Sequence, residues 1–99
     1  MVRWTKPAKR DLKKIHDYIA EDSTYYAKKV VQDIISKTEY LKNFPGMGRP
    51  VPELSEPNVR ELIIYSYRLI YEIKEKQIDI LIIIHGKRDF PEVYQKKNR

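Results

Sequence analysis

The chain has 99 residues, of which 41% are hydrophobic, and its 20 Lys and Arg against 14 Asp and Glu give a formal net charge of +6. This length and composition predict one folded domain over residues 1–99 and exclude a disordered chain or two separate cores. The chain has no cysteine, which excludes disulfides, thiolate nucleophiles and cysteine-based zinc sites. The positive charge favours a polyanionic partner, either a nucleic acid or an acidic protein.

The sequence predicts a cytoplasmic protein without a membrane partner. The N-terminal stretch MVRWTKPAKR has no apolar segment of the kind found in signal peptides. The longest apolar run, Ile80–Ile84, is far shorter than the roughly 20 residues that span a bilayer. Metal-ligand spacings, glycine-rich phosphate loops and nucleophile motifs are absent from the sequence, so we expect neither a cofactor nor a metal site.

The N-terminal half predicts a short edge strand over residues 2–4 followed by two helices. Thr5 is a suitable N-cap for the first helix, Pro7 suits its first turn, and its apolar positions recur at helical spacing (Leu12, Ile15, Ile19). The opposite face is basic and is either solvated or a contact surface for RNA or DNA (Lys9, Arg10, Lys13, Lys14). Residues 21–24 offer N-caps for the second helix, which has a long apolar stripe and ends at residues 43–45 (Ala27, Val30, Val31, Ile34, Thr38, Leu41). The two helices should form an αα-hairpin that covers a sheet.

The C-terminal half predicts three strands. Residues 44–58 hold four of the six prolines, so we expect a loop with fixed bends, in which Arg49 serves as an anchor or, alternatively, as a catalytic group. Three runs rich in β-branched and aromatic residues follow, over residues 59–65, 67–73 and 78–85. The third is apolar on both faces, as expected of a central strand. The predicted fold is α+β, in the order β-α-α-β-β-β, with an antiparallel sheet and a short C-terminal tail or helix.

A basic cluster is the candidate site. Arg68 lies on the second predicted strand, His85 and Arg88 at the end of the third, and Tyr94 just beyond. Brought together, these groups would bind an anion. RNA cleavage by 2′-hydroxyl attack needs a proton acceptor, stabilisation of the charged phosphate and a proton donor. Arginine can supply the second and His85 the first or third, while Tyr94 could stack on a base or act as a weak acid.

Each residue of this cluster also has a structural explanation. His85 could cap the strand through a backbone carbonyl, and Arg68 could pair with Glu61 or Glu72. Arg88 could pair with Asp89 or with an acidic helix residue, and Tyr94 could pack on the sheet. The remaining aromatic residues of the strands are expected to be core or half-buried (Trp4, Tyr65, Tyr67, Tyr71). Residue spacing alone therefore does not define an enzyme.

Several stretches, in this order, resemble the RelE/ParE superfamily of toxins from type II toxin–antitoxin modules, often named plasmid stabilisation proteins. The resemblance covers nearly the whole chain. It rests on residues 7–8 (PA), 11–12 (DL), 15–19 (IHDYI), 44–50 (FPGMGRP), 59–62 (VREL), 67–73 (YRLIYEI) and 85–89 (HGKRD). It implies a helical hairpin on an antiparallel sheet and a dedicated antitoxin, for which the charge of +6 favours an acidic segment that folds on binding.

The resemblance implies two possible targets. RelE-like members cut mRNA on the ribosome, whereas ParE-like members inhibit DNA gyrase without cutting RNA. Arg68, Arg88 and Tyr94 match two catalytic arginines and a tyrosine of RelE-like toxins, but Val59 and Glu61 replace the lysines that those toxins carry on the preceding strand. The helical hairpin, the FPGMGRP loop and the HGKRD segment look more like ParE.

We therefore expect a growth-inhibiting toxin whose first predicted activity is that of a metal-independent, ribosome-dependent endoribonuclease. Its predicted catalytic residues are Arg68, His85, Arg88 and Tyr94, and its predicted RNA contacts are Arg60, Lys87, Lys96 and Lys97. On this interpretation Arg68→Ala or Arg88→Ala abolishes toxicity and leaves the fold intact. The alternatives are a ParE-like gyrase inhibitor and an inactive binding module.

Overall fold

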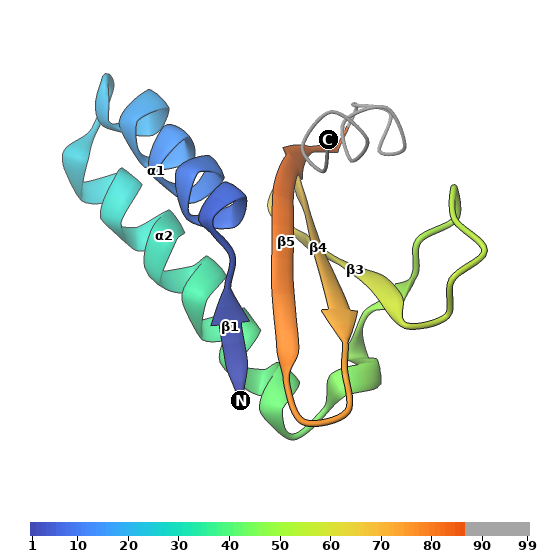
Figure 1. The fold of residues 1–99 in the computed structure, drawn as a ribbon. Helices are drawn as coiled ribbons and strands as arrows, with labels where there is room; N and C mark the ends of the chain where they lie inside the picture. Colours follow the sequence, from blue (N-terminus) through green and yellow to red (C-terminus); the bar gives the residue numbers. More distant parts are fainter. Residues whose placement is uncertain (87–99) are drawn as a thin grey trace.

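Two antiparallel helices cover one face of a five-stranded sheet (Figure 1). The structure is a computed structural model, and it describes residues 1–86. Its helices and strands, in chain order, are β1 (Val2–Trp4), α1 (Lys6–Ala20), α2 (Thr24–Glu39), the 3-10 turns η1 (Tyr40–Lys42) and η2 (Pro45–Met47), β2 (Arg49–Pro50), β3 (Val59–Ile64), β4 (Tyr67–Ile73) and β5 (Ile78–His85). The predicted α+β class is confirmed.

Both helices begin where the sequence predicts. The Thr5 side chain accepts a hydrogen bond from the Ala8 backbone N–H, and the Ser23 side chain caps α2 by accepting from Tyr26. These caps satisfy backbone donors that have no partner within the helix. The helix α2 ends earlier than predicted, at Glu39, and continues as the 3-10 turn η1.

The sheet is mixed rather than purely antiparallel. Its strand order is β1-β5-β4-β3-β2, and β1 runs parallel to β5, with Val2 opposite Ile78 and Trp4 opposite Ile80. The helical hairpin makes the parallel pairing possible, because it returns the chain over the sheet between β1 and the antiparallel meander β3-β4-β5. The short strand β2 lies in the predicted loop and pairs with β3, which sequence analysis did not predict.

The strand β5 contains an irregularity of one residue. Tyr71 of β4 lies opposite Ile80, but the preceding Ile70 lies opposite Ile82, so Leu81 has no partner in the β4 register. An extra residue of this kind is a β-bulge, and it reverses which face the following side chains occupy. The residues after Leu81 are therefore out of phase with those before it.

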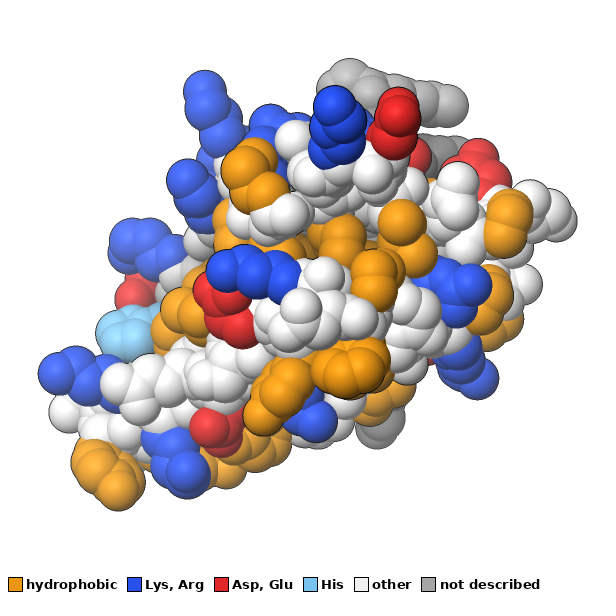
Figure 2. Space-filling model, turned by 90° about the horizontal axis from the view of Figure 1, so that it is seen from below, with side chains coloured by type: hydrophobic (Ala, Val, Ile, Leu, Met, Phe, Trp, Pro, Cys, Tyr) orange, Lys and Arg blue, Asp and Glu red, His pale blue; other side chains and the backbone are white. Residues whose placement is uncertain are grey.

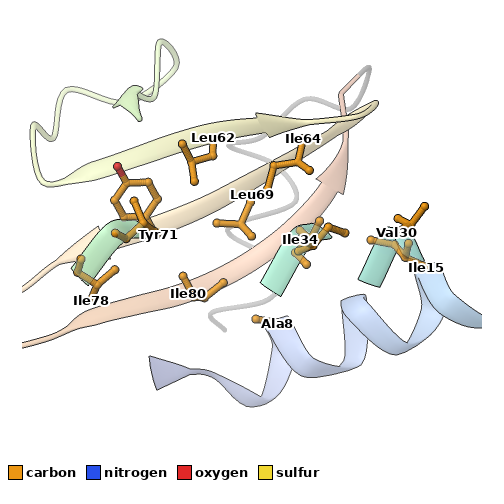
Figure 3. Close-up of a cluster of buried hydrophobic side chains, with 12 residues drawn as sticks. Ala8, Ile15, Val30, Ile34, Leu62, Ile64, Leu69, Tyr71, Ile78 and Ile80 are labelled. Carbon is orange, nitrogen blue, oxygen red and sulfur yellow. The ribbon is translucent and has the colours of Figure 1, made fainter. Parts of the chain in front are cut away.

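The main core lies between the helices and the sheet (Figure 3). Side chains of the two helices pack against β3, β4 and β5; among those buried are Ala8, Ile15, Val30, Ile34, Leu62, Ile64, Leu69, Tyr71, Ile78 and Ile80. A smaller cluster on the other face of the sheet consists of Val51, Val59, Ile70, Ile82 and Ile84, with Leu54 and Leu81 packed against it. Of the aromatic residues predicted to be core or half-buried, Tyr71 is fully buried and Trp4 and Tyr67 are partly buried, whereas Tyr65 is exposed.

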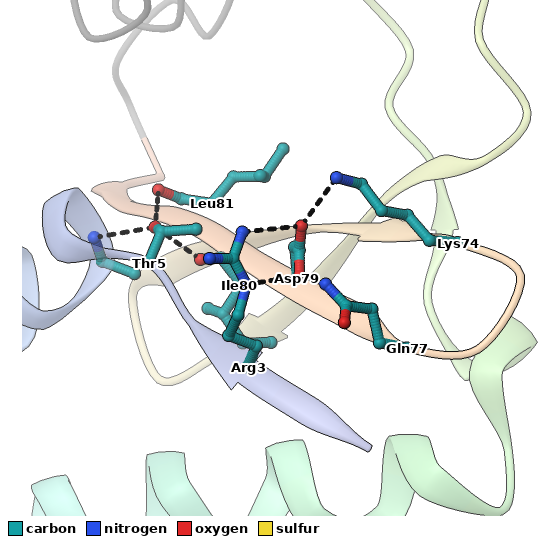
Figure 4. A network of polar contacts seen from close by, with 8 residues as sticks. Arg3, Thr5, Lys74, Gln77, Asp79, Ile80 and Leu81 are labelled. Atoms are coloured by element: carbon teal, nitrogen blue, oxygen red, sulfur yellow. Dashed lines mark hydrogen bonds and ion pairs between the residues drawn. The ribbon is translucent and has the colours of Figure 1, made fainter.

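The N-terminal strand is held to the sheet by a buried carboxylate (Figure 4). Asp79, which is 1% exposed, accepts hydrogen bonds from Arg3 Nε at 3.0 Å and from Gln77, and pairs with Lys74 at 2.9 Å. The hydrogen bond from Arg3 is the main cause that lowers the pKa of Asp79 well below its usual range. Asp79 thus joins β1, β5 and the β4–β5 turn.

We expect Asp79→Asn to weaken the acid dependence of folding. A carboxyl group whose pKa is lowered by folding stabilises the native state above its unfolded pKa, near ~3.9, and loses that contribution as the pH falls toward its folded pKa. Urea denaturation at a series of pH values measures this. The wild type should lose stability more steeply than the variant below roughly pH 4. Equal slopes would show that Asp79 is not a major linked group.

Positive side chains are distributed widely over the surface. Figure 2 shows Lys and Arg around the margin of the face seen from below, with hydrophobic side chains between them. Within residues 1–86, no helix is both long and apolar enough to cross a membrane.

Candidate functional site

Arg68 lies in a buried ion-pair cluster. Its Nη1 and Nη2 donate hydrogen bonds to the Glu53 carboxylate at 2.9 and 2.8 Å, and Nη2 also donates to Glu61 Oε1 at 2.7 Å. Arg68 is 8% exposed and Glu61 is 2% exposed. The hydrogen bond to Glu53 is the main cause that raises the pKa of Arg68. The structure thus shows the predicted pairing of Arg68 with Glu61 and a second partner, Glu53. The prediction that the Arg68 guanidinium faces solvent is wrong, because Arg68 is buried.

The β3–β4 register explains this cluster. Ile63 lies directly opposite Arg68, so Glu61, two residues away on the same face of β3, is a diagonal neighbour within reach of a long side chain. The segment after β2 adds Glu53 from outside the sheet. Two carboxylates around one guanidinium explain how Arg68 can be buried.

His85 lies on the opposite face of the sheet from Arg68. In the β4–β5 pairing, Arg68 is opposite Ile84, whereas His85 is opposite Tyr67. Directly paired residues share a face, and successive residues alternate. His85 is exposed at the end of β5, and its ring meets that of Tyr67 edge-on, with centroids 6.1 Å apart. The expectation that Arg68 and His85 share a solvent-facing margin is therefore wrong.

Two further arginines hold the 45–50 segment against β3. Arg49 donates to Glu61 Oε2 at 3.2 Å, consistent with its predicted role as a loop anchor. Arg60, a predicted RNA contact, is partly buried and donates from Nη1 to the Gly48 carbonyl at 2.9 Å. Its Nε is buried and has no hydrogen-bond partner among the residues that the structure describes.

The other predicted site residues lie outside the described residues 1–86. These are the catalytic candidates Arg88 and Tyr94 and the RNA-contact candidates Lys87, Lys96 and Lys97. Of the predicted catalytic set, Arg68 and His85 are described, and the sheet separates them. Within residues 1–86 no group of three or more acidic or histidine side chains could hold a metal ion.

A groove of about 830 Å³ lies between the helical hairpin and the end of the sheet. We call it the tyrosine groove, because tyrosines from α1, α2, the β3–β4 turn and β4 line it (Tyr18, Tyr26, Tyr65, Tyr67). The charged and titratable side chains beside them are Asp11, Lys14 and His85. Sequence analysis missed it, because its walls come from segments far apart in the chain. The one sequence feature that could have indicated this groove is Tyr18, an aromatic residue four positions after Lys14 on the polar side of α1.

Tyr65, which lines this groove, has an unusual backbone conformation. Its φ of 55° is in the left-handed region, which a bulky residue rarely adopts. Its hydroxyl donates a hydrogen bond to Asp33 of α2, which is the main cause that raises its pKa to about 12. The hydrogen bond of this hydroxyl ties the β3–β4 turn to α2.

The fold and these contacts define a class of protein: a helical hairpin on a mixed sheet, with the loop before β3 held to the sheet by arginines that pair with glutamates or donate to the backbone. Residues 2–90 match the family model described as the ParE toxin of the type II toxin–antitoxin system parDE. The chain is 33% identical over 94 residues to the candidate toxin Y4kP of Sinorhizobium fredii, covering 93% of this chain and 94% of that protein. The chain thus belongs to the ParE toxin family, within the RelE/ParE superfamily that the sequence resembles.

Solved structures agree with this assignment. A chain of the chromosomal ParDE toxin–antitoxin system from P. aeruginosa superposes with a TM-score of 0.72 at 30% identity, covering 87% of this chain and 95% of that one. A chain of the RelBE toxin–antitoxin complex from Mycobacterium tuberculosis gives a TM-score of 0.59 at 21% identity, covering 86% and 88%. The second likeness concerns the fold alone.

Proposed function

We propose that this ParE-family toxin arrests growth by inhibiting DNA gyrase, without cutting RNA. The observation that carries the proposal is the position of Arg68, which is enclosed by Glu53 and Glu61 on the face of the sheet away from His85. A guanidinium neutralised by two carboxylates is a poor stabiliser of a phosphorane-like charge. The position of Arg68 therefore speaks against its predicted role in the ribosome-dependent endoribonuclease expected from the sequence.

The antitoxin is part of the proposal. The matched family and the ParDE structural neighbour are toxin–antitoxin systems, and a chain with a net charge of +6 is electrostatically suited to an acidic partner. We propose that a cognate antitoxin with an acidic segment and apolar anchors neutralises this toxin. Co-expression of the protein encoded beside it should restore growth, and a basic or neutral partner that restores growth equally well would contradict the charge argument.

A pair of histidine variants tests the choice of target in cells. His85 and His16 are both on the surface, so His85→Ala and His16→Ala should each leave the fold intact. The gyrase proposal expects both variants to arrest growth on induction about as strongly as the wild type. The measurement is colony survival after induction, with protein levels checked by immunoblot.

A selective loss of toxicity in His85→Ala would contradict the proposal. It would assign the acid–base step to His85 and favour mRNA cleavage. Absence of growth arrest by the wild type itself would instead favour the inactive binding module.

A further inference from the structure

The helix α1 carries a row of exposed side chains that leads to the tyrosine groove. We call it the α1 row; it consists of Lys6, Arg10, Lys14 and Tyr18, which are spaced four residues apart and are all exposed. Residues four apart lie next to one another along a helix. Lys14 and Tyr18 line the tyrosine groove, so the row joins the groove to the beginning of α1. Figure 1 shows α1 following directly after the end of β1.

The charge of this row is unfavourable for the helix itself. The first turn of α1 contains no acidic residue, and its N-terminal half carries Lys6, Lys9 and Arg10. Cations near a helix N-terminus are repelled by the helix dipole. Asp11 adjoins the row but is buried and accepts the Ile83 N–H at 3.0 Å, and Asp17 contacts Lys13 and His16. Cations at the start of a helix break a local charge rule, and exceptions of this kind are expected at functional sites.

The aromatic side chains in and beside this row suit the unstacked bases of a single strand rather than a duplex. Tyr18 is 72% exposed, Tyr26 is 47% exposed, and both line the tyrosine groove with Tyr67 and Lys14. Proteins that hold single strands combine a positive track for phosphates with aromatic faces on which unstacked bases lie. An acidic peptide would satisfy the cations, but it has no flat bases to stack on the tyrosine rings.

We propose that the tyrosine groove and the α1 row bind single-stranded nucleic acid, with phosphates along Arg10 and Lys14 and a base against Tyr18. This site is independent of the proposed gyrase inhibition. Its loss would leave that proposal standing, and inhibition of gyrase would not by itself support it.

Fluorescence anisotropy of the full chain with labelled oligothymidylate and oligouridylate of about 12 nucleotides tests the site. A duplex of the same length and a polyglutamate peptide serve as comparison ligands. Tyr18→Ala should weaken single-strand binding roughly 5- to 100-fold at fixed salt. Lys14→Ala should make the slope of log affinity against log salt shallower by about 0.7.

The helix α2 supplies matched controls, since Tyr25 and Lys28 are exposed and do not line the groove. Tyr25→Ala and Lys28→Ala should leave single-strand affinity and its salt slope unchanged. The proposal is overturned if the controls weaken binding as much as the groove variants, or if the duplex binds as tightly as the single strands. Groove-dependent binding of polyglutamate without binding of oligonucleotides would assign the groove to an acidic protein instead.

Discussion

Replacing Arg68 by alanine is expected to lower the free energy of unfolding by about 3–5 kcal/mol. The substitution leaves the Glu61 carboxylate buried without its closest cation, at a position that is 2% exposed. Urea denaturation followed by circular dichroism measures the loss. Any reduction in toxicity of this variant is then expected to follow from unfolding, in contrast to the intact fold that an active-site arginine would predict.

Arg49 is the matched control for this substitution. It pairs with the same Glu61 carboxylate, but its side chain is 67% exposed, so Arg49→Ala should cost no more than roughly 1 kcal/mol. Adding Glu61→Leu to Arg68→Met should restore part of the stability that Arg68→Met loses, because it removes the uncompensated charge. A stable but non-toxic Arg68→Ala protein would contradict the structural role and support catalysis by Arg68.

Replacing Gly48 by alanine is expected to lower the free energy of unfolding by about 3 kcal/mol. A Cβ at this position would collide with the Glu61 carbonyl oxygen and would lie 2.8 Å from the Tyr71 hydroxyl. That buried hydroxyl accepts the Gly48 N–H at 2.9 Å and donates to the Pro45 carbonyl at 2.7 Å. Moving it would break the contacts that dock the 45–50 segment on the sheet.

Gly46 provides the control, since a Cβ there would meet no atom within 4 Å. Gly46→Ala should change the free energy of unfolding by no more than roughly 0.5 kcal/mol. The comparison uses urea denaturation of both variants under identical conditions. Equal stability of the two variants would show that the segment can shift away from β3 without loss.

The local elements were predictable because their signals are local. Thr5 and Pro7 mark the start of α1, and the apolar stripe of α2 follows a period of 3.6 residues. Strands β3, β4 and β5 begin at the predicted residues, with β3 ending one residue early, because β-branched runs alternate with polar breaks. The parallel position of β1 was missed, since a three-residue strand carries no signal of its partner.

The candidate site was not predictable because it depends on one residue in β5. Strict alternation from Asp79 onward would place Ile83 opposite Arg68 and His85 on the same face as Arg68. The bulge at Leu81 places Ile84 there instead and turns His85 toward the helices. An uninterrupted apolar run such as Ile80–Ile84 gives no sign of where such a bulge falls, because every position can be buried on either face.

The pairing of Arg68 was predictable in part. Glu61 was identified as a possible partner because two strands joined by a short turn must be neighbours. Glu53 was not, since it belongs to an irregular segment whose path is set by tertiary contacts such as Tyr71 with Pro45 and Gly48. The sequence resemblance was enough to predict the family, whereas the structural role of Arg68 could be read only from its contacts in the folded protein.

The most direct test of the account adds the purified wild-type toxin to two reactions in parallel. One contains DNA gyrase with relaxed plasmid, and the other contains translating ribosomes whose mRNA ends are mapped. We expect plasmid supercoiling to be inhibited and the mRNA to remain uncut. Mapped cleavage of mRNA on the ribosome, with supercoiling unaffected, would contradict the account and return Arg68 and His85 to a catalytic role.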